Sequence, residues 1–166
     1  MIGDVGMALL SEALKVNNTI TTIYFGVNDI GYLGAASLSK ALKVNRTITT
    51  IDFGNNQIGN DGVAFLSEAL KVNRTITTID LWGNQIGDAG AASLSDALKV
   101  NQTLTTLNLQ LNQIGDTSTG AASFSNALKV NRTITTLNLQ LNQIRKSGKK
   151  LLKKISKNNP KITVIT

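Results

Sequence analysis

Two aspartates are the residues of this chain whose type and spacing come closest to a reactive pair. Asp52 and Asp80 occupy equivalent positions in two similar segments, Ile-Asp-Phe-Gly-Asn and Ile-Asp-Leu-Trp-Gly-Asn. Paired carboxylates can act as an acid–base couple or hold a divalent cation. Both tasks need an enclosed site that shifts pKa values or strips water from a metal ion, and an open strand surface lacks one. We therefore expect no catalytic residue, no metal site and no cofactor, and the chain is predicted not to be an enzyme.

The composition removes several other chemistries. The 166 residues include neither cysteine nor histidine, which excludes disulfides, thiol nucleophiles, Cys/His zinc sites and Ser-His-Asp triads. No stretch reads as a signal peptide or a membrane span. A cytoplasmic location is therefore the expectation, with a secreted bacterial effector as the open alternative.

Lysines at the C-terminal end account for the basic character of the chain. The formal charge is +7, yet residues 1–144 carry nine basic and ten acidic groups, whereas residues 145–166 carry eight basic groups and no acidic one. A polar cap is the leading interpretation, because a terminal repeat needs a polar outer face. The alternative is an anion-binding helix that meets nucleic acid or an anionic membrane through Lys149, Lys150, Lys153 and Lys154.

An internal repeat organises the chain from end to end. The block Ile48–Ile58 recurs almost unchanged as Ile76–Ile86. Each copy reads L-x-x-L-x-L-x-x-N-x-L, with Ile, Leu or Phe at the apolar positions, which is the leucine-rich repeat signature. The asparagines of the signature recur at a constant spacing, which is longer only where Thr117 and Ser118 are inserted: Asn28, Asn56, Asn84, Asn112 and Asn142. We expect them to form a buried structural ladder that binds loop backbone groups.

Two periodicities within one repeat predict its local structure. Alternating polar and apolar residues in Thr50–Gly54 indicate a strand, and the apolar residues of segment 64–70 indicate one buried face of a helix. Strand, crossover helix and parallel strand then coil with a right hand. The predicted fold is an α/β solenoid of about six 28-residue repeats, with a parallel sheet on the concave face and helices on the convex face.

A 28-residue repeat with a full helix resembles the ribonuclease-inhibitor class of leucine-rich repeats. Residues 87–101, Gly-Asp-Ala-Gly-Ala-Ala-Ser-Leu-Ser-Asp-Ala-Leu-Lys-Val-Asn, are similar to repeats of NOD-like receptors. The resemblance implies a surface that recognises other proteins or microbial ligands. Ran GTPase-activating proteins share the repeat, so regulation of a GTPase is a further alternative that the resemblance alone implies.

We interpret residues 1–166 as one domain: a partial repeat (1–21), regular repeats (22–144) and a basic capping repeat (145–166). Six helices and six strands are expected, with Val164–Thr166 aligned with Thr136–Asn138. The open edges of the sheet leave a homodimer as one form of partner.

Several repeated polar residues are predicted to be structural. A uniform threonine column, Thr22, Thr50, Thr78, Thr106 and Thr136, is expected to stabilise the strands. Lysines at helix C-terminal ends and Asp4, Asp61, Asp88 and Asp116 near the N-terminal ends complement the helix dipoles. A second asparagine series is expected to end the helices in left-handed geometry: Asn17, Asn45, Asn73, Asn101 and Asn131.

The concave strand positions that vary between repeats are the candidate site. Trp82 is the only tryptophan and is expected to be exposed as an anchor for a partner, with coverage of Gly54 and Gly83 as the alternative. The other protein, whose identity the sequence does not give, would contact two columns of side chains. The predicted partner-binding residues are Tyr24, Asp52, Asp80, Trp82, Asn108, Gln110, Asn138 and Gln140.

Overall fold

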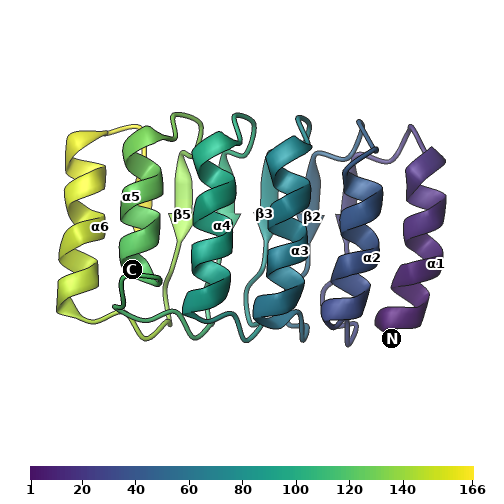
Figure 1. Ribbon diagram of the computed structural model, residues 1–166, viewed down its shortest axis with the longest axis horizontal. Coiled ribbons are helices and arrows are strands. Elements are labelled where there is room, and N and C mark those ends of the chain that lie inside the picture. The colour runs from purple at the N-terminus through teal and green to yellow at the C-terminus, as the bar shows by residue number, and fades with distance from the viewer.

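Helices and strands alternate along the whole chain, and the computed structural model describes residues 1–166 (Figure 1). The helices are α1 (Gly3–Val16), α2 (Tyr32–Leu42), α3 (Gly59–Val72), α4 (Asp88–Val100), α5 (Ala121–Val130) and α6 (Lys146–Asn158). The strands are β1 (Thr22–Tyr24), β2 (Thr50–Asp52), β3 (Thr78–Asp80), β4 (Thr106–Asn108), β5 (Thr136–Asn138) and β6 (Thr163–Ile165). The expected six helices and six strands are all present.

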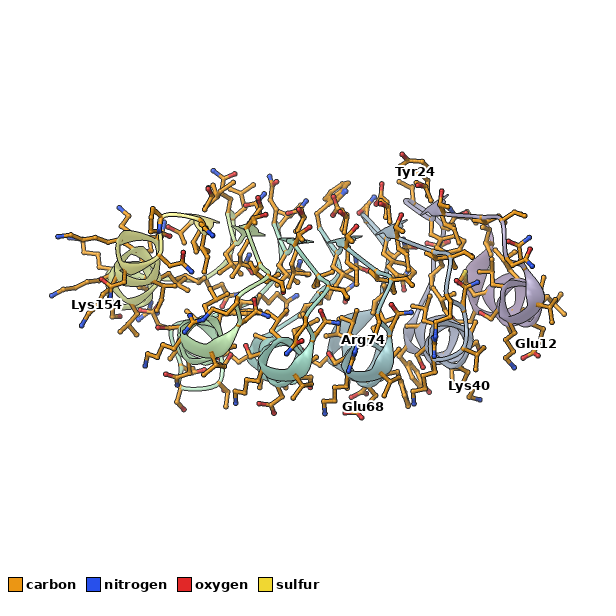
Figure 2. All side chains as sticks on the ribbon, turned by 90° about the horizontal axis from the view of Figure 1, so that it is seen from above. Glu12, Tyr24, Lys40, Glu68, Arg74 and Lys154 are labelled. Carbon is orange, nitrogen blue, oxygen red and sulfur yellow. The ribbon has the colours of Figure 1, made fainter.

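One parallel sheet carries all six strands in chain order, β1 to β6. The helices form a single layer in front of this sheet (Figure 1). Seen from above, the row of helices bends so that α1 and α6 turn toward the strand side (Figure 2). The sheet therefore lines the concave side and the helices the convex side, as predicted.

The hydrophobic core lies between the two layers and runs the length of the array. The central residue of each inner strand, for example Ile51 or Leu107, is fully buried, and Leu38 and Leu94 meet these side chains from the helices. The buried hydrophobic side chains form one cluster of 39 residues. Among the helices, each one contacts only the helix before it and the helix after it, so the core is built by stacking neighbours.

The predicted asparagine ladder connects the loops of successive repeats. Asn84 is 0% exposed; its Nδ2 donates to the carbonyls of Phe53 and Trp82 at 2.9 and 3.0 Å, and its Oδ1 accepts from the N–H of Ile58 at 3.3 Å. Asn56 and Asn112 are buried in the same way, whereas the end members Asn28 and Asn142 are half-buried. The structural role expected for this series is confirmed.

The second asparagine series forms another ladder, and its predicted left-handed geometry is wrong. Asn101 has φ −74° and ψ 133°, which is extended backbone. Its Oδ1 accepts from the N–H groups of Thr103 and Leu104 at 2.9 and 2.8 Å, and its Nδ2 donates to the carbonyl of Leu70 in the preceding repeat at 2.8 Å. In this extended backbone conformation, the single side-chain amide of Asn101 bonds both its own loop and the neighbouring helix.

Left-handed backbone occurs instead just before the first ladder. The residue that precedes each ladder asparagine has φ between 54° and 65°, at Val27, Asn55, Gly83, Leu111 and Leu141. Only one of these is glycine, although a left-handed conformation costs other residues roughly 1–2 kcal/mol. The ladder bonds on the next residue hold the turn in this shape at all five positions.

The N-termini of α2, α4 and α6 are each capped by a polar side chain of the preceding repeat, whereas the equivalent Asp88 accepts from the N–H of Gly115 in the loop before α5. Asp4 Oδ1 accepts from the N–H groups of Gly31 and Gly34 at 2.7 and 2.9 Å, and Asn60 Oδ1 does the same for Gly87 and Gly90. Asp61 lies in the first turn of α3, near the N-terminal end as expected, and it is the neighbouring Asn60 that caps the next helix. Asp4 lies in the first turn of α1, so it complements the dipole of its own helix and also caps the next one.

Asp116 caps the last helix and has a perturbed pKa. The hydroxyl of Ser147 and the N–H of Arg145 both donate to its carboxylate. These bonds, that of the Gly148 N–H and the positive charge of Arg145 hold the pKa of Asp116 below its ordinary value. Directly after Asp116, the inserted Thr117 and Ser118 bulge between β4 and α5, and the Thr117 hydroxyl donates to Asp88.

The threonines directly before the strands form a ladder, one residue earlier than predicted. Thr49, Thr77 and Thr105 donate their hydroxyl protons to the carbonyls of Thr21, Thr49 and Thr77 at 3.0 to 3.2 Å, and Thr135 does the same to Thr105. The column that begins at Thr22 points to the concave surface and makes no such side-chain bond. The difference of one residue matters because strand side chains alternate between faces.

The last strand is also displaced by one residue from its expected register. Thr163 pairs with Thr136 and Val164 with Leu137, whereas Val164 was expected beside Thr136. The loop before β6 turns more tightly than the others, because the N–H of Ile162 bonds the backbone carbonyl of Asn159. In the regular repeats the corresponding N–H bonds the asparagine side chain, as at Ile134 and Asn131.

Comparing two asparagines of the second ladder tests what this ladder contributes. Asn17 keeps the bonds to its own loop, but its Nδ2 donates to the hydroxyl of Thr19 and to no backbone carbonyl. We expect Asn101→Ala to lower the free energy of unfolding by about 2–4 kcal/mol, since buried carbonyls and N–H groups lose partners, and Asn17→Ala by about 1 kcal/mol. Urea unfolding followed by circular dichroism measures both; equal losses would contradict a bond that joins repeats.

Candidate functional site

Two rows of side chains cross the concave face at the ends of the strands. Strand pairing places Tyr24, Asp52, Asp80, Asn108 and Asn138 side by side on successive strands. The residues before and after each of them are more deeply buried, so these five project outward. The second row follows two residues later in each repeat and consists of Gly26, Gly54, Trp82, Gln110 and Gln140.

The polar side chains of the two rows are fixed by hydrogen bonds to one another. Asp80 Oδ2 accepts from Asn108 Nδ2 at 2.9 Å, and Gln110 Oε1 accepts from Asn138 Nδ2 at 3.2 Å. Asp80 Oδ1 also accepts the N–H of Trp82 at 2.9 Å. Side chains held in this way lose little further entropy when a ligand contacts them.

Both aromatic residues lie on this face, but they differ in exposure. Tyr24 is 75% exposed and points away from the sheet (Figure 2). Trp82 is half-buried rather than exposed as predicted, because its indole lies over the backbone of Gly54, where a Cβ atom would collide with Nε1 and Cδ1. The alternative, in which Trp82 covers neighbouring glycines, is correct for Gly54 and wrong for Gly83, which lies against Asn55.

The two carboxylates lie on an open surface and already accept backbone hydrogen bonds. Asp52 and Asp80 are paired across β2 and β3. Asp52 Oδ1 accepts the N–H of Gly54 at 2.7 Å, as Asp80 accepts that of Trp82. No group of three or more acidic side chains gathers anywhere in the chain. This arrangement can accept hydrogen bonds from a partner's donors.

The largest cavity lies away from the predicted site. Its volume is about 820 Å³, and it opens beside the inserted loop, lined by Asp88, Asp116, Thr117 and Arg145 among others. Both aspartates already accept hydrogen bonds, Asp88 from Gly115 in the loop and Asp116 from Arg145 at the start of α6. No sequence pattern indicated this hollow, which exists because the insertion widens one loop.

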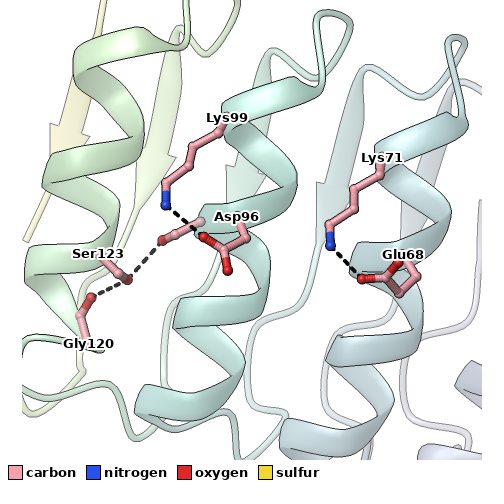
Figure 3. Close-up of polar contacts among 7 residues, drawn as sticks. Glu68, Lys71, Asp96, Lys99, Gly120 and Ser123 are labelled. Atoms are coloured by element: carbon pink, nitrogen blue, oxygen red, sulfur yellow. Dashed lines mark hydrogen bonds and ion pairs between the residues drawn. The ribbon is translucent and has the colours of Figure 1, made fainter.

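The lysines proposed as an anion site all belong to α6. Lys154, the one shown in Figure 2, points outward beyond the C-terminal end of the array. None of Lys149, Lys150, Lys153 and Lys154 has a carboxylate within ion-pair distance. Three helix lysines of earlier repeats do: Lys15 pairs with Glu12 at 2.5 Å, and Figure 3 shows Lys71 with Glu68 at 2.6 Å and Lys99 with Asp96 at 2.7 Å.

Three aliphatic side chains next to the predicted site were not anticipated. Val27, Leu111 and Leu141 sit in the left-handed turns and are 63%, 50% and 66% exposed. They extend the two rows along the edge of the concave face. A sequence signal existed, because all three stand directly before a ladder asparagine, where the repeat signature fixes no residue type.

The family is established by the sequence itself. The family described as Leucine Rich repeat matches residues 44–67, 72–95, 100–118 and 130–152, more than half of the chain. The chain therefore belongs to the leucine-rich repeat family. No curated protein sequence matches it. None of its helices is both long and apolar enough to cross a membrane.

Two solved structures illustrate which proteins share the fold. Leiomodin-1 actin-binding site 2 superposes with a TM-score of 0.73 at 21% identity, covering 90% of this chain and 87% of that one. The tropomodulin C-terminal domain of Caenorhabditis elegans gives a TM-score of 0.77 at 11% identity, covering 93% of each chain. At these identities the similarity shows that the three chains share a fold. Similarity to NOD-like receptor repeats stays a prediction.

The single tryptophan reports directly on how it packs over Gly54. In Gly54→Ala the new methyl group must displace the indole, so we expect red-shifted tryptophan emission and stronger quenching by acrylamide. Gly26→Ala is the matched control, because the nearest atom to a Cβ there is the Gly54 carbonyl oxygen at 3.4 Å. Unchanged emission in Gly54→Ala would show that Trp82 does not rest on this glycine.

Proposed function

We propose that this chain is a non-catalytic protein-binding module that holds its partner on the concave face of the sheet. Fixed polar groups beside exposed aromatic and aliphatic side chains carry this proposal. The Asp80–Asn108 and Asn138–Gln110 bonds present donors and acceptors at set positions. Such a surface recognises a partner without first having to become ordered.

The aromatic end of the face is the proposed anchor. Large amphipathic side chains contribute most to protein interfaces when they enter a pocket of the partner, and Tyr24 stands free to do so. Trp82 adds a flat apolar surface beside Asp80. Donors on the partner, such as arginine or backbone N–H groups, fit the carboxylates of Asp52 and Asp80.

The solved structures support the coarser part of this proposal. The leiomodin-1 structure is described as an actin-binding site, so a repeat array of this size serves protein binding in that protein. Purified monomeric actin is therefore the first defined probe, followed by proteins captured from a cell extract.

Removing both aromatic side chains tests the proposed anchor. We expect the Tyr24→Ala/Trp82→Ala double variant to lose at least about 2 kcal/mol of binding free energy, about a 30-fold weaker dissociation constant. Biolayer interferometry with the captured partner measures this. Circular dichroism confirms that the fold is retained.

Tyr32 and Phe65 provide the matched control for that experiment. Both are exposed aromatics on the helix side, 50% and 45% accessible. The Tyr32→Ala/Phe65→Ala variant should bind as the parent chain does. Undiminished binding by the concave double variant, or an equal loss in the control, would refute the concave site.

The unpaired lysines of α6 favour one further candidate function, binding of a polyanion. Lys149, Lys150, Lys153 and Lys154 lie close together on one helix, and no carboxylate neutralises them. Four uncompensated charges on one helix attract phosphate groups and release their counterions. The concave face has the opposite character at Asp52 and Asp80, so the two surfaces would serve different partners.

Replacing those four lysines by glutamine tests the polyanion candidate. If each contacts a phosphate, duplex DNA should bind the parent chain about 100-fold more weakly at about 200 mM than at about 50 mM salt, and the variant should lose most of this dependence. Fluorescence anisotropy measures binding to DNA, and co-sedimentation with phosphatidylserine vesicles measures binding to a membrane.

A charge-matched variant serves as the control. Lys15, Lys43, Lys71 and Lys99 all lie at the C-terminal ends of earlier helices. Changing these four to Gln removes the same charge elsewhere. If both variants bind equally, or if neither polyanion is bound at all, α6 is only a polar cap.

A further inference from the structure

The side of α6 that faces away from α5 differs from the packing side of every inner helix. On the inner helices this side carries small residues: the Cβ atom of Ala121 of α5 lies 3.1 Å from where a Cβ atom of Gly148 of α6 would be, and the hydroxyl of Ser95 of α4 lies 2.9 Å from a serine hydroxyl of α5 (Figure 3). The same two repeat positions of α6 are Lys149 and Lys153. A helix packed there would bury two ammonium groups, which is costly.

The repeat position that caps a following helix is a lysine as well. Asp116 accepts from the N–H of Arg145 at the start of α6, and Lys146 holds the same repeat position as Asp116. An ammonium group cannot accept hydrogen bonds from the N–H groups of a helix N-terminus, and the helix dipole repels it. All three positions that join one repeat to the next are therefore lysine in α6, so the residue types themselves keep this side exposed.

No carboxylate of the neighbouring elements neutralises these lysines. Asp116 is the last acidic residue of the chain, and its carboxylate already accepts hydrogen bonds. Where α3 and α4 have Glu68 and Asp96, which pair with lysines, α6 has Lys154. α5 and β6, the two elements that contact α6, contain no acidic residue. This end of the array therefore has a positive potential that attracts an anionic partner.

Six lysines share the outer side of α6. At about 100° per residue they fall within an arc of about 140°, over a length of about 16 Å. Four of them are successive i+3 or i+4 neighbours and form a straight row along the helix, and the other two flank this row. Lys154, one of the flanking pair, points outward beyond the end of the array (Figure 2). The row consists of Lys146, Lys150, Lys153 and Lys157, and the flanking lysines are Lys149 and Lys154.

The apolar side of α6 is not free to contact a partner. Leu152 and Ile155 belong to the core and are 0% and 8% exposed. Leu151 is 44% exposed, at the repeat position that faces the preceding helix. Because the core holds the apolar side, α6 cannot bury it in a bilayer, and a membrane would be contacted by the lysines at the level of the headgroups.

The arrangement of the lysines favours a flat anionic surface over a nucleic acid. A plane that touches the row is also within reach of the flexible flanking lysines, whereas the convex backbone of a duplex curves away from them. Residues 145–166 contain no aromatic side chain on which the bases of a single strand could stack. Four to eight basic residues on one amphipathic helix are typical of sites for anionic lipids.

We propose that α6 binds the anionic headgroups of a lipid bilayer with its lysine side flat on the membrane, a proposal that deepens the polyanion candidate above and rests on it. The long axis of the array then stands upright on the membrane. Five helix spacings of 8–10 Å place α1 about 40–50 Å from α6 and thus from the headgroups. The concave face opens sideways, and Tyr24, on the strand farthest from β6, stays free for a protein partner.

Co-sedimentation with two kinds of vesicle tests the lipid contact. The parent chain should bind vesicles of phosphatidylcholine with phosphatidylserine and should not bind vesicles of phosphatidylcholine alone. Each lysine near an anionic surface strengthens binding about 5-fold, so the Lys146→Gln/Lys150→Gln/Lys153→Gln/Lys157→Gln variant should bind at least about 100-fold more weakly. The charge-matched variant on the earlier helices should bind nearly as well as the parent chain.

Two single-cysteine variants test the orientation, since the chain has no cysteine of its own. Val16 and Asn158 hold the same repeat position on α1 and α6, and both are exposed. A donor dye on Asn158→Cys should transfer energy efficiently to an acceptor on the lipid headgroups. The same dye on Val16→Cys lies about 40–50 Å farther away and should transfer several-fold less.

The outcomes that overturn the membrane proposal differ from those that overturn the polyanion candidate. If duplex DNA at an equal concentration of accessible phosphate displaces the chain from the vesicles, or binds where the vesicles do not, the membrane proposal is wrong and the polyanion candidate stands. If neither is bound, both are wrong. An equal loss in the charge-matched variant, or equal energy transfer from the two cysteines, would overturn the contact through α6.

Discussion

Hydrogen bonds from two asparagines in every repeat hold the molecule together, and the rest of the structure depends on them. A coil of short strands and helices leaves many loop carbonyls and N–H groups inside the protein, where an unpaired group costs about 1–3 kcal/mol. The ladder of Asn84 serves the loops after the strands, and the ladder of Asn101 serves the loops after the helices. Because both side chains reach into the preceding repeat, satisfying the loops also fixes the repeat spacing.

Because the asparagines and the buried apolar residues hold the fold, the strand positions that face outward are free to vary. Buried positions such as Ile51 and the ladder residue Asn56 are tied to the core and the loops. Asp80, Asn108 and Trp82 have no such task, so they can differ from repeat to repeat while the sheet stays the same. The recognition surface and the scaffold are thus separate sets of residues within a single repeat.

The fold could be predicted from the repeat spacing alone, because identical units with alternating polarity have one way to bury their apolar faces. Details that depend on contacts between repeats could not. Asparagine can end a helix with either left-handed or extended backbone. Asn101 takes the extended backbone because its side chain bonds the carbonyl of Leu70 in the preceding repeat. Trp82 was expected to be exposed because its support, Gly54, lies in the preceding repeat. Which strand positions face the concave side followed from alternation, whereas what binds there does not follow from any residue pattern.

The inserted pair Thr117 and Ser118 shows how much length one loop tolerates. β4 and β5 keep the same pairing across it, Thr106 beside Thr136, although the repeat is two residues longer. Asp88 accepts the hydroxyl of Thr117 at the base of the bulge, and α5 has 10 residues where α4 has 13, so the loop and the first turn of the helix absorb the added length. The loop between a strand and its helix is therefore a place where a peptide can be inserted while the pairing of the neighbouring strands stays the same.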